Sequence, residues 1–146
     1  MKIPAEKIAH YEIVGKIGEG GMGTVYKARD THRECLVALK VLRQERIADA
    51  AHKRRFVQEA RTASALNHPN IITVHDISNQ SGLDFIAMEY VAGQTLDALI
   101  ERKGMKLNDI IRYGIQIADA LAAAHAAGII HRDLKPSNIM VLPRAW

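Results

Sequence analysis

Apolar and polar residues alternate in short runs over the first 90 residues, and this pattern predicts β-strands. The expected strands are Tyr11–Ile17, Thr24–Ala28, Cys35–Leu42, Ile71–Ile77 and Leu83–Val91. Turn-forming residues, Asn79–Gly82, separate the last two strands, so we expect these strands to pair as a hairpin. The first part of the chain is therefore expected to be rich in strands.

A helical spacing, with apolar residues three or four positions apart, follows the third strand. It predicts a helix over roughly Ile47–Leu66, which the segment His68-Pro69-Asn70 ends. A short helix is expected over Leu96–Glu101, with Thr95 as its cap. The pattern thus changes from strand to helix along the chain, and we place the division between a strand-rich and a helical part at Val91–Gln94.

A longer helix is expected from the N-cap Asn108 to about Ala127, with Gly128 as its C-terminal stop. Its apolar stripe is wide and consists of Leu107, Ile110, Ile111, Gly114, Ile115, Ala118, Leu121 and Ala122. A stripe of this width predicts that the helix is buried on at least one side.

Composition narrows the class of protein without naming a function. The 146 residues are 48% hydrophobic and 25% charged, which is typical of a globular domain. The net charge of +4 is too small to indicate a nucleic-acid binder. The single cysteine, Cys35, excludes a disulfide framework and a cysteine zinc cluster, and it favours a cytoplasmic protein. We expect no membrane segment in this chain and no secretory signal, because no apolar run is long enough.

A glycine-rich segment, Gly18-x-Gly20-x-x-Gly23, joins the first two expected strands. In a dinucleotide-binding fold the third glycine opens a helix, but here Thr24-Val25-Tyr26 favours a strand. A P-loop would require a lysine after the last glycine, and none is present. Two alternatives remain at this point: a hairpin turn without a ligand, or a flap whose backbone N–H groups approach phosphates.

A lysine, Lys40, lies within the apolar strand Cys35–Leu42. Burial of a lysine is unfavourable without a nearby anion, and the helix that follows offers Glu59. A Lys40–Glu59 pair would direct the ammonium group toward a ligand phosphate. The alternative is that Lys40 reaches the surface along its own alkyl chain and that Glu59 is a solvated helix residue.

The segment His131–Asn138 gives the strongest indication of chemistry. The Asp133 carboxylate can orient a hydroxyl nucleophile and accept its proton. Lys135 can stabilise negative charge on a transferred phosphoryl group, and the Asn138 amide oxygen is a suitable ligand for magnesium. A charged turn without function is the alternative. The order of glycine loop, strand lysine, helix glutamate and this segment disfavours it.

With these motifs the chain resembles the eukaryotic-like (Hanks-type) bacterial serine/threonine protein kinases over Tyr11–Val141. The resemblance implies an α+β, protein-kinase-like bilobal fold. It would have a five-stranded antiparallel N-lobe sheet with a regulatory helix and a partial helical C-lobe. The implied division is an N-terminal extension at 1–10, the ATP-binding N-lobe at 11–91 and a partial C-lobe at 92–146.

The resemblance also assigns roles to individual residues. It implies a nucleotide site formed by Ile17, Gly18, Gly20, Gly23, Val25, Ala38, Lys40, Met88, Glu89, Val91 and Met140. The glycines would cover the ATP phosphates, Met88 would be the gatekeeper, and the backbone of Glu89 and Val91 would bind the adenine edge. The implied catalytic residues are Asp133, Lys135, Lys40 and Glu59, and the implied magnesium ligand is Asn138.

The resemblance stops near the end of the chain. The sequence ends eight residues after Asn138 and contains neither Asp-Phe-Gly nor Ala-Pro-Glu. The resemblance places the principal magnesium aspartate in the missing Asp-Phe-Gly. We expect its absence to cost several kcal/mol of transition-state stabilisation and so to lower catalysis by thousands-fold, because each ~1.4 kcal/mol is tenfold in rate. Six large apolar residues of the long helix represent roughly 9 kcal/mol of burial. We therefore expect a poorly stable chain that self-associates through this helix.

The expected function is ATP-dependent phosphoryl transfer from Mg-ATP to serine or threonine hydroxyls of a protein, with ATP and Mg²⁺ as cofactors. The alternative is a catalytically inactive remnant that binds a nucleotide or a partner protein. A third alternative is a gene fragment without a function of its own. The expected partner is a protein substrate and no nucleic acid.

Overall fold

The computed structural model describes residues 7–19, 23–42, 51, 54, 57–58, 60–61, 64–80, 82–130 and 134–143. The chain divides into two compact units. The first, which we call the sheet unit, comprises Met1–Asn67 and Ile72–Tyr90. The second, the helical unit, comprises His68–Ile71 and Val91–Trp146. Each unit is described by itself.

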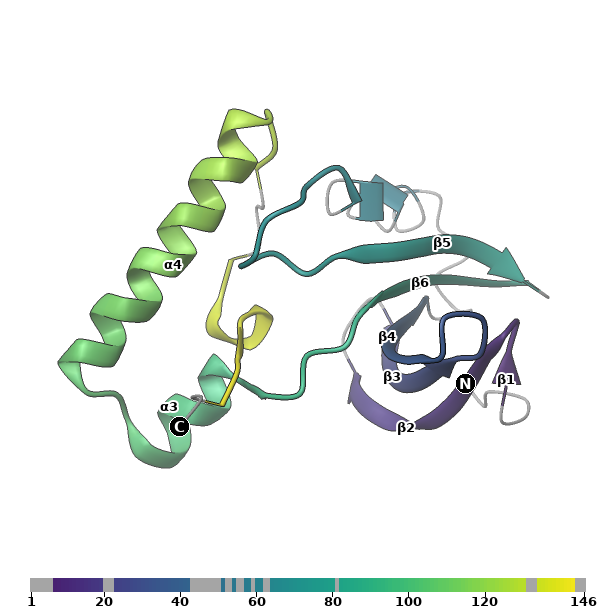
Figure 1. Cartoon of the computed structure of the whole chain (residues 1–146), viewed down its shortest axis with the longest axis horizontal. Helices are drawn as coiled ribbons and strands as arrows, with labels where there is room; N and C mark the ends of the chain where they lie inside the picture. The colour runs from purple at the N-terminus through teal and green to yellow at the C-terminus, as the bar shows by residue number, and fades with distance from the viewer. Residues whose placement is uncertain are drawn as a thin grey trace. The chain divides into compact units, whose positions relative to one another are not determined.

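The sheet unit contains a curled antiparallel sheet of six strands in the order β1-β2-β3-β4-β6-β5 (Figure 1). The strands are β1 (Lys7–Ile8), β2 (Tyr11–Glu19), β3 (Gly23–Asp30), β4 (Cys35–Leu42), β5 (Val74–Gln80) and β6 (Leu83–Glu89). The predicted fold class is confirmed, with one difference in strand number. The additional strand, β1, has two residues, and its Ile8 is buried in the core of the sheet.

Most strand predictions agree with the structure to within three residues. β4 has the predicted bounds, and β5 and β6 form the predicted hairpin, with Gly82 in the left-handed region at φ 80°. The expected strand at Ile71–Ile77 begins only at Val74. The strand begins later than predicted because the Ile71 N–H donates to the His68 carbonyl at 3.1 Å and closes a turn.

The two faces of the sheet bury different clusters. The first cluster consists of Ile8, Tyr11, Ala28, Val37, Leu39, Val41, Leu83, Phe85 and Ala87. The second consists of Leu42, Ala60 and Ile86, with Val57, Val74 and Met88 packed against it. Because side chains alternate along a strand, β4 supplies Leu39 to one cluster and Leu42 to the other. Ala60 belongs to the helix predicted at Ile47–Leu66, of which residues 51, 54, 57, 58, 60, 61 and 64 are described and helical.

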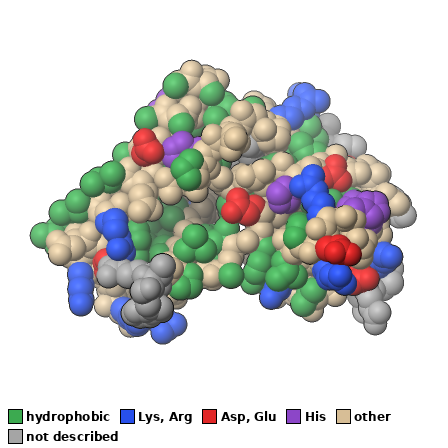
Figure 2. All heavy atoms as spheres, viewed as in Figure 1, with side chains coloured by type: hydrophobic (Ala, Val, Ile, Leu, Met, Phe, Trp, Pro, Cys, Tyr) green, Lys and Arg blue, Asp and Glu red, His purple; other side chains and the backbone are tan. Residues whose placement is uncertain are grey.

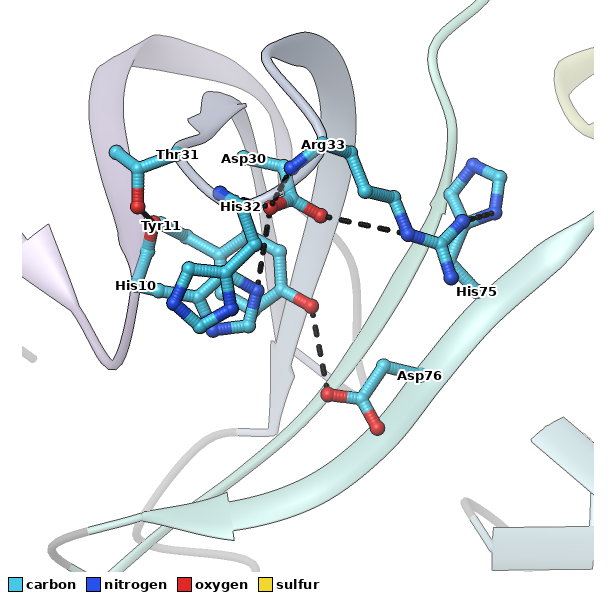
Figure 3. A network of polar contacts seen from close by, with 8 residues as sticks. All are labelled: His10, Tyr11, Asp30, Thr31, His32, Arg33, His75 and Asp76. Atoms are coloured by element: carbon cyan, nitrogen blue, oxygen red, sulfur yellow. Dashed lines mark hydrogen bonds and ion pairs between the residues drawn. The ribbon is translucent and has the colours of Figure 1, made fainter.

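Polar side chains connect segments of the sheet unit that are not neighbours in the sheet (Figure 3). The Tyr11 hydroxyl at the start of β2 donates to Asp76 Oδ2 on β5 at 3.3 Å. Arg33, in the β3–β4 turn, donates from Nη1 to His75 Nδ1 on β5 at 3.0 Å. Since β3, β4 and β6 lie between β2 and β5 in the sheet, these contacts hold the curl of the sheet.

Asp30 lies at the centre of this network and is almost fully buried. Its Oδ1 accepts the backbone N–H groups of His32 and Arg33 at 2.9 and 3.1 Å, and it lies 3.3 Å from His10 Nε2. Burial by itself raises the pKa of Asp30, but these two N–H donors and the charges of His10 and Arg33 outweigh it, so the pKa is lowered. The rings of His10 and His32 stack in parallel beside it, with centroids 3.9 Å apart.

The helical unit contains α3 (Leu96–Lys103), α4 (Leu107–Ala126) and the 3₁₀-helix η1 (Pro136–Asn138). Two short strands, β7 (Gln94–Thr95) and β8 (Met140–Val141), pair in an antiparallel arrangement. In the part of the chain that the structure describes, no helix is both long enough and apolar enough to span a bilayer.

Only the C-terminal end of α4 matches the prediction. Gly128 follows the last turn at φ 78°, and its N–H donates to the His125 carbonyl, so the predicted stop is confirmed. The prediction that Asn108 is the N-cap is wrong, because Lys106 occupies that position. The Lys106 carbonyl accepts the first N–H bonds of the helix, from Asp109 and Ile110, so the helix begins before Asn108.

The prediction that α4 is buried on at least one side holds only in part, because Ala124 is buried and Tyr113, Ile117 and Leu121, on the same side of the helix, are half-buried. Leu107 and Ile115 are 70% and 65% exposed, and Ala124 is the only buried residue of α4 among the described residues. Hydrophobic side chains are visible along the edge of α4 in Figure 2. An apolar stripe indicates that one face of a helix favours burial, but it does not indicate which element packs against that face.

Candidate functional site

The predicted site residues fall into two groups, one in each unit. The sheet unit carries the group from Ile17 to Glu89, and the helical unit carries Val91, Lys135, Asn138 and Met140. Three predicted residues, Gly20, Glu59 and Asp133, lie outside the described residues.

The glycine segment joins β2 to β3, as predicted. Gly18 lies opposite Val25 in the register, and Ile17 beside it is 50% exposed. Gly23 has an additional structural role, because a Cβ at this position would overlap the backbone carbonyl of Val41. Glycine is therefore required at position 23 for the close approach of β3 and β4, whatever the loop binds.

Lys40 lies on the same face of the sheet as several predicted nucleotide-binding residues. In the register it faces Val25 on one side and Ile86 on the other, and Ala38 faces Met88. The alternation along β4 places Ala38, Lys40 and Leu42 on one face. Leu42 and Ile86 on this face pack against Ala60 of the helix. The structure thus brings Val25, Ala38, Lys40 and Met88 together.

The end of β6 is fixed by contacts that the sequence analysis did not identify. The Glu89 N–H donates to the Thr73 carbonyl at 2.8 Å, and the Thr73 N–H donates to Glu89 Oε1 at 3.2 Å. The ammonium of Lys27 lies 4.9 Å from the centre of the Tyr90 ring, within cation–π range. Thr73 and Lys27 have no motif that could have indicated these roles, because the contacts depend on strand pairing.

In the helical unit, Lys135 and Asn138 lie on one tight turn. Lys135 precedes η1, Pro136 starts it, and the Asn138 N–H donates to the Lys135 carbonyl at 2.9 Å. Both residues are exposed. The turn is anchored directly afterwards, because the Ile139 carbonyl accepts the Leu96 N–H at 2.8 Å.

The pairing of β8 with β7 positions the remaining residues of this group. Met140 faces Thr95 in the register. A Cβ at Gly93 would overlap the Val141 carbonyl, so this glycine allows the close approach of β7 and β8. Sequence reasoning did not identify Gly93, which no glycine motif contains.

The two groups offer different chemistry. The small side chain of Ala38 and the apolar Val25 and Met88 fit a flat apolar ring, and the Lys40 ammonium fits an anion. For a magnesium ion, the described predicted ligand is a single amide oxygen, that of Asn138. No group of three or more His, Cys, Asp or Glu side chains suited to a metal occurs among the residues for which the structure gives positions. Mg²⁺ usually keeps several waters and binds phosphates, so one protein oxygen is compatible with it.

Similarities to known proteins agree with this arrangement. Residues 11–145 match the protein kinase domain. The chain is 50% identical over 137 residues to serine/threonine-protein kinase pkn3 of Myxococcus xanthus, and 41% identical over 132 residues to serine/threonine-protein kinase PrkC of Bacillus subtilis. These alignments cover 92% and 90% of this chain, but 25% and 20% of the relatives.

A solved structure shows the same fold. The chain superposes on a crystal structure of the PknI kinase domain of Mycobacterium tuberculosis with a TM-score of 0.80 and 33% sequence identity. The similarity covers 94% of this chain and 57% of that structure. The sequence match over nearly the whole chain and the shared fold lead to one conclusion: the chain belongs to the protein kinase domain family.

Proposed function

We propose that this chain contributes to ATP-dependent phosphorylation of serine or threonine hydroxyls on a protein substrate. The observation that supports this most is the placement of Lys40 between Ala38 and Leu42, on the face that also carries Val25 and Met88. This face offers a cation beside an apolar surface, which suits a nucleotide with its phosphates. The relatives named serine/threonine-protein kinase support the same proposal.

The proposed residue roles are those that the resemblance to protein kinases implies. Ile17, Val25, Ala38 and Met140 contact the adenine, and the glycines at 18, 20 and 23 lie over the phosphates. Lys40, paired with Glu59, contacts the α- and β-phosphates. Met88 limits the depth of the site, and the backbone groups of Glu89 and Val91 bind the adenine edge. The division at 91–92 between an N-lobe and a partial C-lobe belongs to the same proposal.

The proposed reaction transfers the γ-phosphoryl group in line. The substrate hydroxyl oxygen forms a bond to the γ-phosphorus, while the bond from phosphorus to the β–γ bridging oxygen breaks. ADP leaves with the electron pair of that bond, and the hydroxyl proton passes to the Asp133 carboxylate. Lys135 stabilises the charge on the γ-phosphoryl oxygens. Magnesium would neutralise phosphate charge, with the Asn138 amide oxygen as a ligand.

A second candidate function is binding of a nucleotide or a partner protein without catalysis. The exposed apolar face of α4 favours it, because such a face is suited to a protein contact. Self-association through α4 belongs to this candidate. A cytoplasmic location is proposed on the exposed free thiol of Cys35, which a reducing compartment would preserve.

A phosphoryl-transfer assay separates the two functions. The purified chain is incubated with γ-labelled ATP, Mg²⁺ and an acceptor protein, and labelled amino acids are identified after hydrolysis. Label on serine or threonine that falls at least ~100-fold in Asp133→Asn and Lys40→Met supports the enzyme. Lys7→Met, on the exposed residue of β1, is the matched lysine control and should retain the activity. ATP binding without transfer would support the second function instead.

A further inference from the structure

Gly93 lies directly before β7 in the helical unit, and packing, not its backbone angles, requires a glycine there. The glycines with a left-handed backbone among the described residues are Gly82, Gly104 and Gly128, and Gly93 is not one of them. A residue with a side chain could therefore adopt the backbone conformation at position 93. Its Cβ, however, would overlap the carbonyl oxygen of Val141 on β8. Only the close approach of the two backbones requires the glycine.

A Cβ at position 93 would displace β8 more readily than the segment around Gly93. The Gly93 N–H donates to the Val91 carbonyl at 2.9 Å and closes a tight turn. On its other side, β7 leads directly into α3, whose first residue is Leu96. β8, in contrast, has two residues and, among the described residues, one sheet partner, which is β7. The overlap is therefore expected to be relieved by movement of β8.

β8 is continuous with the turn that carries Lys135 and Asn138. Met140 is the first residue of β8 and faces Thr95 across the strand pair. Asn138 is the last residue of η1, which lies beside α3 (Figure 1). Because only Ile139 separates η1 from β8, a shift of β8 also moves the Asn138 amide.

We propose that Gly93 is a positioning residue for the Asn138 amide oxygen and the Met140 side chain. The missing Cβ lets β8 approach β7 closely, and this approach sets where the two side chains lie within the helical unit. The inference rests on the proposed function, which assigns Asn138 to magnesium and Met140 to adenine. It adds a residue that acts through the backbone of β8 and has no side chain to contact either ligand.

The size of the displacement indicates a measurable effect. A shift on the order of 1 Å would remove the overlap, and a misplacement of that size can cost about a hundredfold in rate. Metal ligands are sensitive to such changes, since loss of a group that orients a ligand lowers metal affinity roughly ten- to hundredfold. Gly93→Ala should therefore weaken the binding of ATP more in the presence of magnesium than in its absence.

The test measures the dissociation constant of ATP for the whole chain by titration calorimetry, once with Mg²⁺ and once with EDTA. The ratio of the constant in EDTA to the constant in Mg²⁺ is called the magnesium enhancement. In Asn138→Ala and in Gly93→Ala the magnesium enhancement should fall about tenfold. In the double variant it should fall no further, because both substitutions act on the same ligand.

The matched control is Gly114→Ala, which adds the same Cβ in α4 at a position with no atom within 4 Å. It should leave the magnesium enhancement unchanged. A merely structural role of Gly93 would reduce the fraction of chains that bind ATP and leave the enhancement intact. That result, or a further loss in the double variant, would overturn the inference alone. A wild type that binds no ATP, or shows no enhancement, would contradict the proposed function and the inference together.

Hydrogen exchange in the ligand-free chain gives a second readout. The Leu96 N–H donates at 2.8 Å to the carbonyl of Ile139, which directly precedes β8. In Gly93→Ala the Leu96 amide should exchange at least about tenfold faster, because movement of β8 weakens this bond. The Ala127 amide, which donates to the Ala123 carbonyl at the end of α4, should keep its rate. An unchanged rate at Leu96, or an equal increase at both amides, would count against the inference.

Discussion

In the sheet unit, Val37, Leu39 and Val41 of β4 are fully buried, whereas in the helical unit Leu107 and Ile115 of α4 are largely exposed. Both segments are rich in apolar residues. The sheet unit contains the partners of its apolar residues, because β3, β6 and the network around Asp30 all belong to it. Among the described residues of α4, Ala124 is the only one that is buried.

The comparison shows that a hydrophobic pattern predicts which side chains favour burial. Whether they are buried depends on other segments that pack against them. In a sheet, the neighbouring strands that cover these side chains are often joined to them by local hairpins. A helix that packs on distant elements depends on residues remote in sequence. The two units should therefore respond differently to substitution.

The largest difference is expected from truncation of apolar side chains. Leu39→Ala should lower the free energy of unfolding of the sheet unit by about 3 kcal/mol, because it leaves a cavity in a packed core. Ile115→Ala in α4 should change stability by less than about 0.5 kcal/mol, because the side chain is already exposed. Urea unfolding followed by circular dichroism measures both. Equal effects would remove the distinction between the units.

A smaller effect is expected from the buried carboxylate of the sheet unit. Asp30→Asn should destabilise the chain by about 1–3 kcal/mol, because Asp30 accepts two N–H groups and lies near His10 and Arg33. Asp119→Asn, at an exposed carboxylate 3.0 Å from His68 in the helical unit, should cost at most about 1 kcal/mol.

The acid dependence of stability gives a second readout for Asp30. Its pKa is lowered in the folded chain, so its contribution is present above the pKa of the unfolded chain and is lost as pH falls through the folded value. The wild type should therefore lose stability more steeply than Asp30→Asn below about pH 4. Parallel curves for the two proteins would contradict this account of the network.

Alanine substitutions at two glycines should change the free energy of unfolding in opposite directions. Gly23→Ala should destabilise the sheet unit by about 1–3 kcal/mol, because the new Cβ overlaps the Val41 carbonyl and the strands must move apart. Gly114→Ala in α4 should stabilise the helix by about 0.5–1 kcal/mol, because no atom lies within contact distance of its Cβ. Thermal unfolding of both variants measures the difference. A loss of stability in Gly114→Ala would indicate that a partner covers α4.

The smallest effect on stability is expected from charge on the exposed face of α4. Ile115→Glu should leave the unfolding transition within about 0.5 kcal/mol of the wild type. It should lower self-association, because an apolar contact would then bury a charge. Sedimentation velocity over a range of concentrations measures this, with Glu101→Gln in α3 as a control for surface charge. Identical sedimentation of wild type and Ile115→Glu would argue against association through α4.

The sequence predicted well those parts of the fold that local pattern determines. β4 has the predicted bounds, the hairpin at Gly82 forms, and α4 ends before Gly128. The start of α4 was misplaced because Asn108 is a favourable capping residue, although the backbone of Lys106 already accepts the first helical bonds.

Features that depend on long-range contacts could not be predicted. Tyr11 and Asp76 are 65 positions apart, and Arg33 and His75 are 42 apart, so no spacing rule connects them. The candidate site was predicted residue by residue from motifs and from the resemblance to protein kinases, and the grouping of Lys40 with Val25 emerges only from strand register. The pairing of Thr73 with the Glu89 carboxylate requires knowledge of both strands and of a side-chain conformation.

The short pairing of β7 with β8 has a consequence for the order of folding. It joins residues 94–95 to 140–141 and thereby closes a long loop that contains α3, α4 and the turn of Lys135 and Asn138. Closing a loop of this length has an entropic penalty that two residue pairs only partly offset. We expect the helices to form first and the turn to dock last, so that the segment proposed for phosphoryl transfer is also the first to open when the protein begins to unfold.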